Sequence, residues 1–538
     1  MYEMTIPKFI RDSLALYQDK EYIVYKNKRY SFKEFEAYTR RIAKGLIALG
    51  FRKGDRLVLW LSNFPEWMAL WFGCQRAGII PVPVNTRFRQ HDLTYVLQQS
   101  RAKGIVIMGK YLNIDYPAII EEMIPEIREH EAGSWTSQQF PLLQWIISIE
   151  PQCPYGALSL DQIERLGERL PDHHLDAYEA KVYPEDIACI LFTSGTTSFP
   201  KSVLLSQSQI IMNGFKAGDR LGLTSDDRFL TTLPFFGSFM CLNAIFSVTS
   251  HRGCFVLQDH FDAQEALRLI EEEKVTVIFG PDTVFRDILN HPDRQKRDLS
   301  SWKKGMGAPI HRKTLEQLIR EVGVTHMVQG YGLTETSAVC AIGESDDPME
   351  VRLSTVGRPL PGIDIAIYDA EKGVFLPPNE RGEIVVKGPS IFLGYEGKPL
   401  QTIQATLPGG WFRTGDIGMM TSSGHLVFLG RFKDMLKVGG FSVAAQEIEQ
   451  FLSAFPEVEE AAIVGLPDER LQEVPAAFIK LLPGKRLTEE EVVERCQQIA
   501  NYKRPRVVRF VDDFPRTQTG KVKKDELKKM LLDSNTHA

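Results

Sequence analysis

An alternation of strand-like and helix-like segments is the feature that most constrains the fold of this chain. Residues 54–62, GDRLVLWLS, have the apolar run of a buried strand, residues 65–78, PEWMALWFGCQRAG, have the length of a helix, and residues 79–85, IIPVPVN, indicate a second strand. The alternation recurs at residues 275–291, VTVIFGPDTVFRDILNH. Because strands that alternate with helices form largely parallel sheets, the chain is predicted to be an α/β protein.

The pattern of residue types changes after residue 355. Residues 357–369, GRPLPGIDIAIYD, and 382–388, GEIVVKG, are short β-branched runs interrupted by glycine and proline, which predicts a β-rich portion. Nearer the end, residues 458–468 and 506–514 resemble strands, and residues 487–502 resemble a helix that begins with a capping box, Thr488 and Glu491. The last part of the chain is therefore expected to be a small α+β domain.

Composition excludes several classes of protein. A chain of 538 residues exceeds one ordinary core, so two or more domains are expected. The net charge of −5 gives no field that would attract nucleic acid or an anionic membrane. Seven cysteines without a C-x-x-C pair fit a reducing compartment, and the histidines lack metal-ligand spacing. Without a signal-peptide pattern or an apolar run long enough to span a bilayer, the protein is expected to be soluble and cytoplasmic.

Residues 191–202, LFTSGTTSFPKS, form a hydroxyl-rich stretch that ends in a proline and a lysine. A Walker loop needs glycine before its lysine, whereas Pro200 precedes Lys201 and has no N–H to offer a phosphate. The stretch is either a Ser/Thr-rich surface turn or a phosphate cradle of another kind. Taken alone, it does not decide between the two.

Four further stretches favour a phosphate cradle over a surface turn. They are YGLTET at 331–336, GWFRTGDIG at 410–418, GRFKDMLKVGGFSVAAQEIE at 430–449 and PRTQTGKVKKDEL at 515–527. Together with the 191–202 stretch, their order and spacing resemble the core motifs of the adenylate-forming superfamily, which includes acyl-CoA synthetases, luciferases and peptide-synthetase adenylation domains. The resemblance implies a large N-terminal domain of stacked α/β subdomains plus a β-rich portion, residues 1–431, and a small mobile α+β C-terminal domain, residues 432–538.

The resemblance also implies a nucleotide site. In this family a carboxylate displaces pyrophosphate from ATP, and a thiol then displaces AMP. Tyr331 is expected to stack on adenine, Thr334 to bond the α-phosphate, and Glu335 to hold magnesium through a hard oxygen ligand. Asp416 is expected to accept hydrogen bonds from both ribose hydroxyls, with Arg431 assisting. The full set of ATP-binding residues implied by the resemblance comprises Thr193, Ser194, Gly195, Thr196, Thr197, Lys201, Gly330, Tyr331, Gly332, Asp416 and Arg431.

The C-terminal motifs imply one active site that serves both steps. Lys521 resembles the lysine that bridges the carboxylate and the α-phosphate during adenylation, so Lys521, Thr334 and Glu335 are the predicted catalytic residues. Lys433 corresponds to the pivot about which the small domain rotates. Rotation would withdraw Lys521 and bring in Gly439 and Gly440, whose backbone can approach a pantetheine thiol closely.

Two departures from the family pattern lie in the 191–202 stretch. Ser198 and Ser202 stand where the family has glycines, and a positive φ at either position would cost about 1–3 kcal/mol of strain.

The acyl pocket is expected to involve Phe236, Gly237, Met240, Gly307 and Ala308. Residues 235–243, FFGSFMCLN, are apolar and contain no acidic residue, which favours an apolar acid over an amino acid.

Three hypotheses on function remain open from the sequence. The first is an ATP-dependent ligase that uses magnesium, activates a fatty or aromatic acid as acyl-AMP and transfers it to coenzyme A. The second is an acyl-AMP ligase that loads the phosphopantetheine of a carrier protein. The third is a degenerate homologue that binds nucleotide without catalysis. The sequence leaves open the identity of the acid, the acceptor, the pathway and the oligomeric state.

Overall fold

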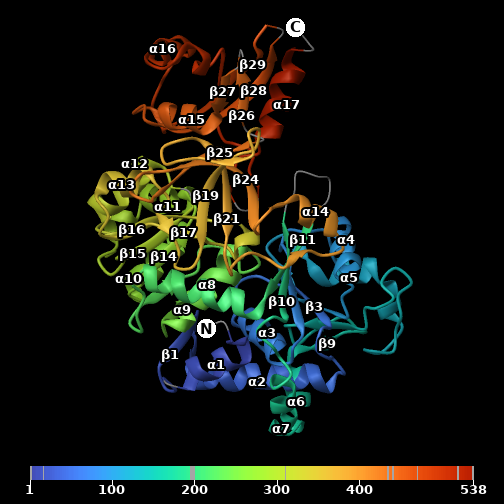
Figure 1. Cartoon of the computed structure of the whole chain (residues 1–538). Helices are drawn as coiled ribbons and strands as arrows, with labels where there is room; N and C mark the ends of the chain where they lie inside the picture. The colour runs from blue at the N-terminus through green and yellow to red at the C-terminus, as the bar shows by residue number, and fades with distance from the viewer. Residues whose placement is uncertain are drawn as a thin grey trace.

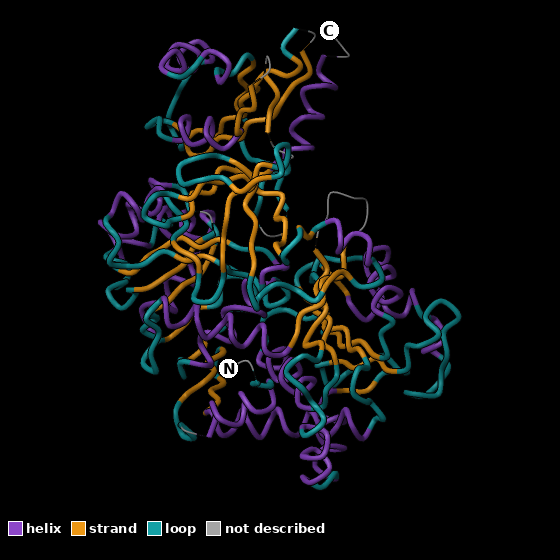
Figure 2. Tube along the Cα trace, viewed as in Figure 1, coloured by secondary structure: helices purple, strands orange, loops and turns teal. Residues whose placement is uncertain are grey.

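The computed structural model describes residues 3–15, 17–193, 200–308, 310–432, 435–438, 441–468, 470–517 and 520–535. Figure 1 shows a large body that holds the N-terminus and a smaller part above it that holds the C-terminus. The α/β class is confirmed, because strands and helices alternate through the large body, and Figure 2 shows helices packed along the strands. In the described residues, no helix is both long and apolar enough to cross a bilayer.

The first sheet carries the strands that lead to the predicted nucleotide site. Its order is β18-β17-β16-β15-β14-β12-β13-β1-β2, and its central pairs, from β1 to β16, are parallel. The bounds are β1 Glu21–Tyr25, β2 Lys28–Ser31, β12 Arg228–Leu230, β13 Cys254–Val256, β14 Val277–Gly280, β15 Lys304–Gly307, β16 His326–Tyr331, β17 Ala341–Ile342 and β18 Arg358–Pro359.

A second parallel sheet has the order β4-β3-β5-β8-β9. It contains β3 Arg56–Trp60 and β4 Ile80–Pro83, joined by helix α3 Pro65–Arg76, as the alternation in the sequence predicted. Its other strands are β5 Gly104–Ile107, β8 Trp145–Ser148 and β9 Leu158–Ser159. Trp67, Trp71 and Arg76 of α3 are fully buried, and one hydrophobic core includes residues of both sheets. The helix therefore contributes to a core shared by the two sheets.

Helices cover these two sheets. They are α1 Ile6–Ala15, α2 Phe32–Ala48, α4 Gln90–Ser100, α5 Tyr116–Met123, α6 Leu160–Arg169, α7 Asp172–Glu179, α8 Gln207–Arg220, α9 Ile245–Ser250, α10 Ala263–Glu272, α11 Asp282–Asn290, α12 Arg312–Gln317 and α13 Met349–Ser354. Helix α11 follows β14 directly, which places its N-terminal turn at the carboxyl end of that strand.

The short hairpin β6 Lys110–Tyr111 and β7 Ile114–Asp115 and two larger antiparallel sheets complete the large domain. One joins the hairpin β10 Ile187–Thr193 and β11 Lys201–Ser206 to β22 Gly394–Tyr395, which precedes helix α14 Pro399–Gln404. The other is the β-rich portion expected after residue 355. Its strands are β19 Asp364–Asp369, β20 Val374–Phe375, β21 Gly382–Lys387, β23 Thr406–Leu407, β24 Trp411–Met420 and β25 Leu426–Arg431. Figure 1 shows β24 and β25 just below the C-terminal part.

The C-terminal domain has its own sheet, in the order β27-β26-β29-β28 with β30 beside β29, and its own two hydrophobic clusters. Helix α16 begins at the capping box predicted from the sequence, since the Thr488 hydroxyl accepts from the Glu491 N–H and the Glu491 carboxylate from the Thr488 N–H. The separate C-terminal domain is thus confirmed, while its boundary between residues 431 and 432 stays a prediction. The elements are β26 Met435–Val438, β27 Phe441–Ala444, β28 Val458–Asp468, β29 Gln472–Leu481, β30 Val507–Phe510, α15 Ala445–Ser453, α16 Glu489–Arg495 and α17 Lys524–Asn535.

Candidate active site

The carboxyl ends of β14, β15 and β16 meet at one edge of the first sheet. Gly280 pairs with Gly307, and Gly307 with Gln329, so these strand ends are neighbours. Ligands of open α/β sheets bind beyond the carboxyl ends of the strands. The predicted residues Gly330, Tyr331 and Gly307 therefore lie where such a site is expected.

The chain folds back tightly after Tyr331. A side chain at Gly332 would place its Cβ 2.3 Å from the carbonyl oxygen of Ala338, so only glycine fits there. Ser337 and Ala338 have φ angles of 60° and 81°, which costs non-glycine residues about 1–3 kcal/mol each. This strained return encloses the short helix η5 Thr334–Thr336, which holds two of the predicted catalytic residues, Thr334 and Glu335.

Tyr331, Asp416 and Arg431 come together from three strands. The Tyr331 hydroxyl donates to Oδ2 of Asp416 at 2.8 Å, and Nε of Arg431 lies 3.4 Å from Oδ1. Asp416 and Arg431 are opposite each other on β24 and β25. Burial raises the pKa of Tyr331 well above its usual value, so the hydroxyl stays a donor. A carboxylate with two oxygens retains acceptor capacity for a further pair of hydroxyls.

The Tyr331 ring is covered on one side. Its centroid lies 5.5 Å from that of Phe428 on β25, and the residue is only 6% exposed. Phe428 and the hydroxyl bond to Asp416 fix the ring, which limits the surface that an adenine base could contact.

A second group links Glu335 to the predicted phosphate stretch. The Tyr395 hydroxyl donates to Oε1 of Glu335 at 2.9 Å, and burial raises the pKa of Tyr395 above its usual value. The ammonium nitrogen of Lys201 lies 4.5 Å from the centroid of the Tyr395 ring, a cation–π contact. Thr193 pairs with Lys201 at the open end of the β10–β11 hairpin. Tyr395 thus links Lys201 to the buried carboxylate of Glu335, and Thr193 lies opposite Lys201 in the hairpin.

Several predicted residues lie outside the described residues. They are Ser194, Gly195, Thr196 and Thr197 of the phosphate stretch, the neighbouring Ser198, the pivot Lys433, and Gly439 and Gly440 of the thiol-step loop. Ser202 is described: it lies in β11 opposite Phe192 and is not among the residues with positive φ, so the strain considered from the sequence does not arise there.

Lys521 lies on a turn of the C-terminal domain that reaches the same edge of the sheet. The turn is closed by hydrogen bonds from the Thr517 N–H to the Lys521 carbonyl at 2.7 Å and from the Lys521 N–H to the Thr517 hydroxyl at 3.1 Å. A Cβ built on Gly520 would lie 3.2 Å from Oγ1 of Thr283, in the first turn of α11. The Lys521 turn is therefore packed beside the carboxyl end of β14.

The predicted acyl-pocket residues come from two segments. Phe236 and Gly237 lie before the π-helix η2 Phe239–Ala244, in which Met240 is fully buried. The ring of Phe239 stacks on Phe279 of β14 with centroids 5.7 Å apart, which holds this segment against the strand. Gly307 ends β15, the neighbouring strand, and Ala308 follows it, so both segments approach the edge that the Lys521 turn contacts.

Tyr395 and Phe428 were not predicted from the sequence. Neither stands in a motif: Tyr395 is an isolated aromatic residue after Gly394, and Phe428 belongs to an ordinary apolar run, residues 426–429. Their roles depend on the pairing of β11 with β22 and of β24 with β25, which the motifs do not specify.

The predicted nucleotide-site residues lie at the carboxyl edge of an α/β sheet, and the Lys521 turn of a second domain packs beside that edge. Residues 10–396 match the AMP-binding enzyme family, and residues 447–521 match the AMP-binding enzyme C-terminal domain. The chain belongs to this family, and the predicted membership of the adenylate-forming superfamily is confirmed.

Relatives and solved structures agree. The chain is 33% identical to YngI of Bacillus subtilis (strain 168), by name an acyl-CoA synthetase, over 98% of this chain and 97% of that protein. It is 32% identical to the mitochondrial medium-chain acyl-CoA ligase ACSF2 of Mus musculus, over 98% and 87%. It resembles the crystal structure of the anthranilate CoA ligase AuaEII with anthranoyl-AMP, at 25% identity and a TM-score of 0.87 over 100% and 99%. The predicted class, an AMP-forming acid–CoA ligase that uses ATP and coenzyme A, is confirmed.

Proposed function

We propose that this chain joins an apolar carboxylic acid to coenzyme A at a single nucleotide site, and that Lys521 serves the first of two steps. The observation that carries the proposal is the meeting of separate sequence stretches at one sheet edge. Tyr331, Asp416 and Arg431 form one contact group, and Lys201 and Glu335 a second around Tyr395. The Lys521 turn packs beside the same edge.

In the first step an oxygen of the acid attacks the α-phosphorus of ATP. The bond from that phosphorus to the oxygen of pyrophosphate breaks, and acyl-AMP and pyrophosphate result. Negative charge collects between the carboxylate and the phosphate, so a positioned ammonium group and aligned donors lower the barrier. In this proposal Lys521 supplies the ammonium group and the Thr334 hydroxyl donates to the α-phosphate.

In the second step the thiol sulfur attacks the carbonyl carbon of acyl-AMP. The bond from that carbon to the phosphate oxygen breaks, AMP leaves, and the thiol proton is released. Phosphate is already a good leaving group, so this step has less need of Lys521. Gly439 and Gly440 are proposed to face the thiol once Lys521 has withdrawn by rotation about Lys433.

Glu335 fits the role of a magnesium ligand. Its carboxylate is a hard oxygen donor, it is buried, and the Tyr395 hydroxyl holds one of its oxygens. Magnesium is commonly bound by one or two carboxylates together with substrate phosphates, and when bound it offsets phosphate charge. The proposed phosphate contacts from Thr193 and Lys201 lie on the same side of the site.

The acid is proposed to be fatty or aromatic. Phe236 and Met240 bring apolar side chains to the acyl segment, and residues 235–243 contain no carboxylate that could pair with an α-amino group. The names of the relatives point the same way, since ACSF2 is a medium-chain acyl-CoA ligase and AuaEII an anthranilate CoA ligase.

Pyrophosphate exchange tests the proposal. Exchange is measured with straight-chain, branched, aromatic and amino acids, and thioester formation is then measured with free coenzyme A and with a phosphopantetheine-loaded carrier protein. We expect exchange with an apolar acid and product with coenzyme A. Product with the carrier protein alone would identify the carrier protein, and not coenzyme A, as the acyl acceptor. Exchange with none of the acids would favour a protein that binds nucleotide without catalysis. A cytoplasmic location stays a prediction.

A further inference from the structure

A polar contact joins helix α11 of the large domain to strand β28 of the C-terminal domain. Nη2 of Arg286 donates to Oε2 of Glu460 at 3.0 Å, and Nη1 donates to the carbonyl oxygen of Glu459 at 3.0 Å. The side chains of Arg286 and Glu460 are only 13% and 9% exposed. One guanidinium group therefore makes two bonds across the domain interface in a largely desolvated place.

On the C-terminal side, Glu460 is connected to the Lys521 turn. Nη1 of Arg516 donates to Oε1 of Glu460 at 3.2 Å and to the carbonyl oxygen of Gly520 at 3.0 Å. Gly520 immediately precedes Lys521, and Arg516 pairs with Val522 across the turn. Glu460 thus lies between Arg286 of one domain and the arginine that holds the Lys521 turn in the other.

On the large-domain side, Arg286 is connected to the predicted acyl segment. Its Nε lies 2.9 Å from Oδ2 of Asp282, the first residue of α11. Oδ1 of Asp282 accepts from the backbone N–H of His311 at 2.9 Å. His311 follows the segment that begins with Gly307 and Ala308, so the contact network extends from the end of β15 to the Lys521 turn.

The charges of this network support one another. Burial acts to raise the pKa of Glu460, but the hydrogen bond from Arg516 and the charges of Arg286 and Arg516 outweigh it and leave the pKa below its usual value. Asp287, beside Arg286, has a raised pKa through burial, offset in part by Arg286 and Lys480. Glu460 is therefore held ionised at the interface, where it bonds Arg286 of the other domain.

We propose that Arg286 and Glu460 are positioning residues that dock the C-terminal domain in the orientation in which Lys521 serves adenylate formation. The inference rests on the proposed function of Lys521. Misplacement of a catalytic group by about 1 Å can cost about a hundredfold in rate, so a contact that sets the docking of the lysine turn affects the step that uses it. The thioester step, in which Lys521 is withdrawn, does not need the contact.

The test separates the two half-reactions in E460Q, which keeps the shape of the side chain, and R286M, which keeps an unbranched apolar stem; each variant removes one charge. We expect pyrophosphate exchange to fall about 10- to 100-fold in kcat, with KM for ATP nearly unchanged, because the nucleotide contacts lie on other strands. Thioester formation from supplied acyl-AMP should stay within about twofold of the unaltered protein. R286K, which keeps the charge, should recover part of the loss. The double variant should lose less than the product of the single losses.

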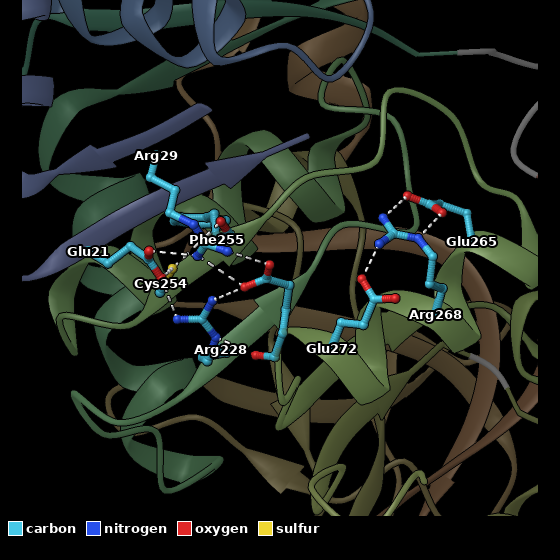
Figure 3. A network of polar contacts seen from close by, with 9 residues as sticks. Glu21, Arg29, Arg228, Cys254, Phe255, Glu265, Arg268 and Glu272 are labelled. Carbon is cyan, nitrogen blue, oxygen red and sulfur yellow. Dashed lines mark hydrogen bonds and ion pairs between the residues drawn. The ribbon is translucent and has the colours of Figure 1, made fainter. Parts of the chain in front are cut away.

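Two other arginines provide matched controls. Arg268 of α10 is paired with Glu265 and Glu272 within one helix of the large domain, as Figure 3 shows. Arg381 crosses to Glu447 of the C-terminal domain at 3.5 Å, but its side chain is 58% exposed. R268M and R381M should leave both half-reactions unchanged, since exposed pairs contribute little.

Domain orientation gives a readout that does not depend on activity. Spin labels on cysteines introduced at the exposed Leu400 and Val493, in a C153S background, report the distance between the domains. R286M should broaden the distance distribution, whereas R268M should not.

Equal losses in both half-reactions, or no loss of activity together with an unchanged distance distribution, would overturn the inference. Should R286M not fold, R286K and E460Q carry the test. If the unaltered protein exchanges pyrophosphate with no acid, the proposed function fails, while the label distances still report on the docking contact.

Discussion

The proposed nucleotide-binding residues and the Lys521 turn are built in contrasting ways. Tyr331 and Asp416 are 6% and 3% exposed, lie on strands of the large domain and bond to each other. Lys521 is exposed on a turn of the other domain, which meets the sheet edge through α11. A group fixed by strand pairing can hold a ligand through both steps, whereas a group on a docked turn can be present for one and withdrawn for the other. The contrast predicts different patterns of loss in the two regions.

K521A should have the largest effect. Loss of the ammonium group should lower pyrophosphate exchange by about a hundred- to a thousandfold, since it removes charge stabilisation at the reacting phosphate. Thioester formation from supplied acyl-AMP should remain mostly intact. The measurement is the ratio of the two rates, with K523A, a neighbouring lysine paired with Glu526, as the control. Similar losses in both rates would erase the contrast between the regions.

D416A should have the next largest effect, and in both steps. Loss of a carboxylate that accepts from Tyr331 and is proposed to bond ribose should cost about 1.5–3 kcal/mol, or about ten- to a hundredfold in kcat/KM for ATP. The rate with supplied acyl-AMP should fall as well, since acyl-AMP carries the same ribose. If D416A lost only adenylate formation, Asp416 would serve the first step alone, as proposed for Lys521.

G332A should weaken the fold of the fixed region. The new methyl group would meet the Ala338 carbonyl oxygen, 2.3 Å from the Cβ position, and overpacking of this kind costs about 1–3 kcal/mol. The measurement is the free energy of unfolding in denaturant. G237A is a matched control, because its Cβ would meet only the Pro234 carbonyl at 3.3 Å. Equal stability of G332A and G237A would show that the return after Tyr331 relaxes easily.

Y395F should have the smallest effect. It removes the hydroxyl that orients Glu335 but keeps the ring beneath Lys201, so we expect about a fivefold higher magnesium concentration for half-maximal pyrophosphate exchange. Y155F, at a tyrosine that is 64% exposed, serves as the control. An unchanged magnesium requirement would show that the Tyr395 hydroxyl does not prepare Glu335 to bind magnesium.

The sequence predicted what local pattern determines. The strand, helix and strand at β3, α3 and β4 follow from apolar runs, and the start of α16 follows from the hydrogen-bonding chemistry of Thr488 and Glu491. The family motifs predicted Asp416 and Arg431 as parts of one site, and the two residues do lie opposite each other on the paired strands β24 and β25.

Contacts between distant stretches could not be predicted in this way. Tyr395 reaches Glu335 only because β22 pairs with β11, and Arg286 reaches Glu460 only because two domains meet there. The sequence around a lone arginine in a helix or a lone glutamate in a strand does not indicate which residue the side chain contacts. Gln207 is another case, because it is buried between the backbone of Ile6 and the side chain of Gln75.

We expect one nucleotide to lie across the two groups of fixed residues, with the Lys521 turn docked beside it. A crystal structure with a non-hydrolysable ATP analogue would show this arrangement. We expect ribose hydroxyls within hydrogen-bonding distance of Asp416, the α-phosphate beside Thr334, and the Lys521 ammonium group directed at that phosphate. A triphosphate bound away from Thr193 and Lys201, or a ribose that does not contact Asp416, would contradict the account.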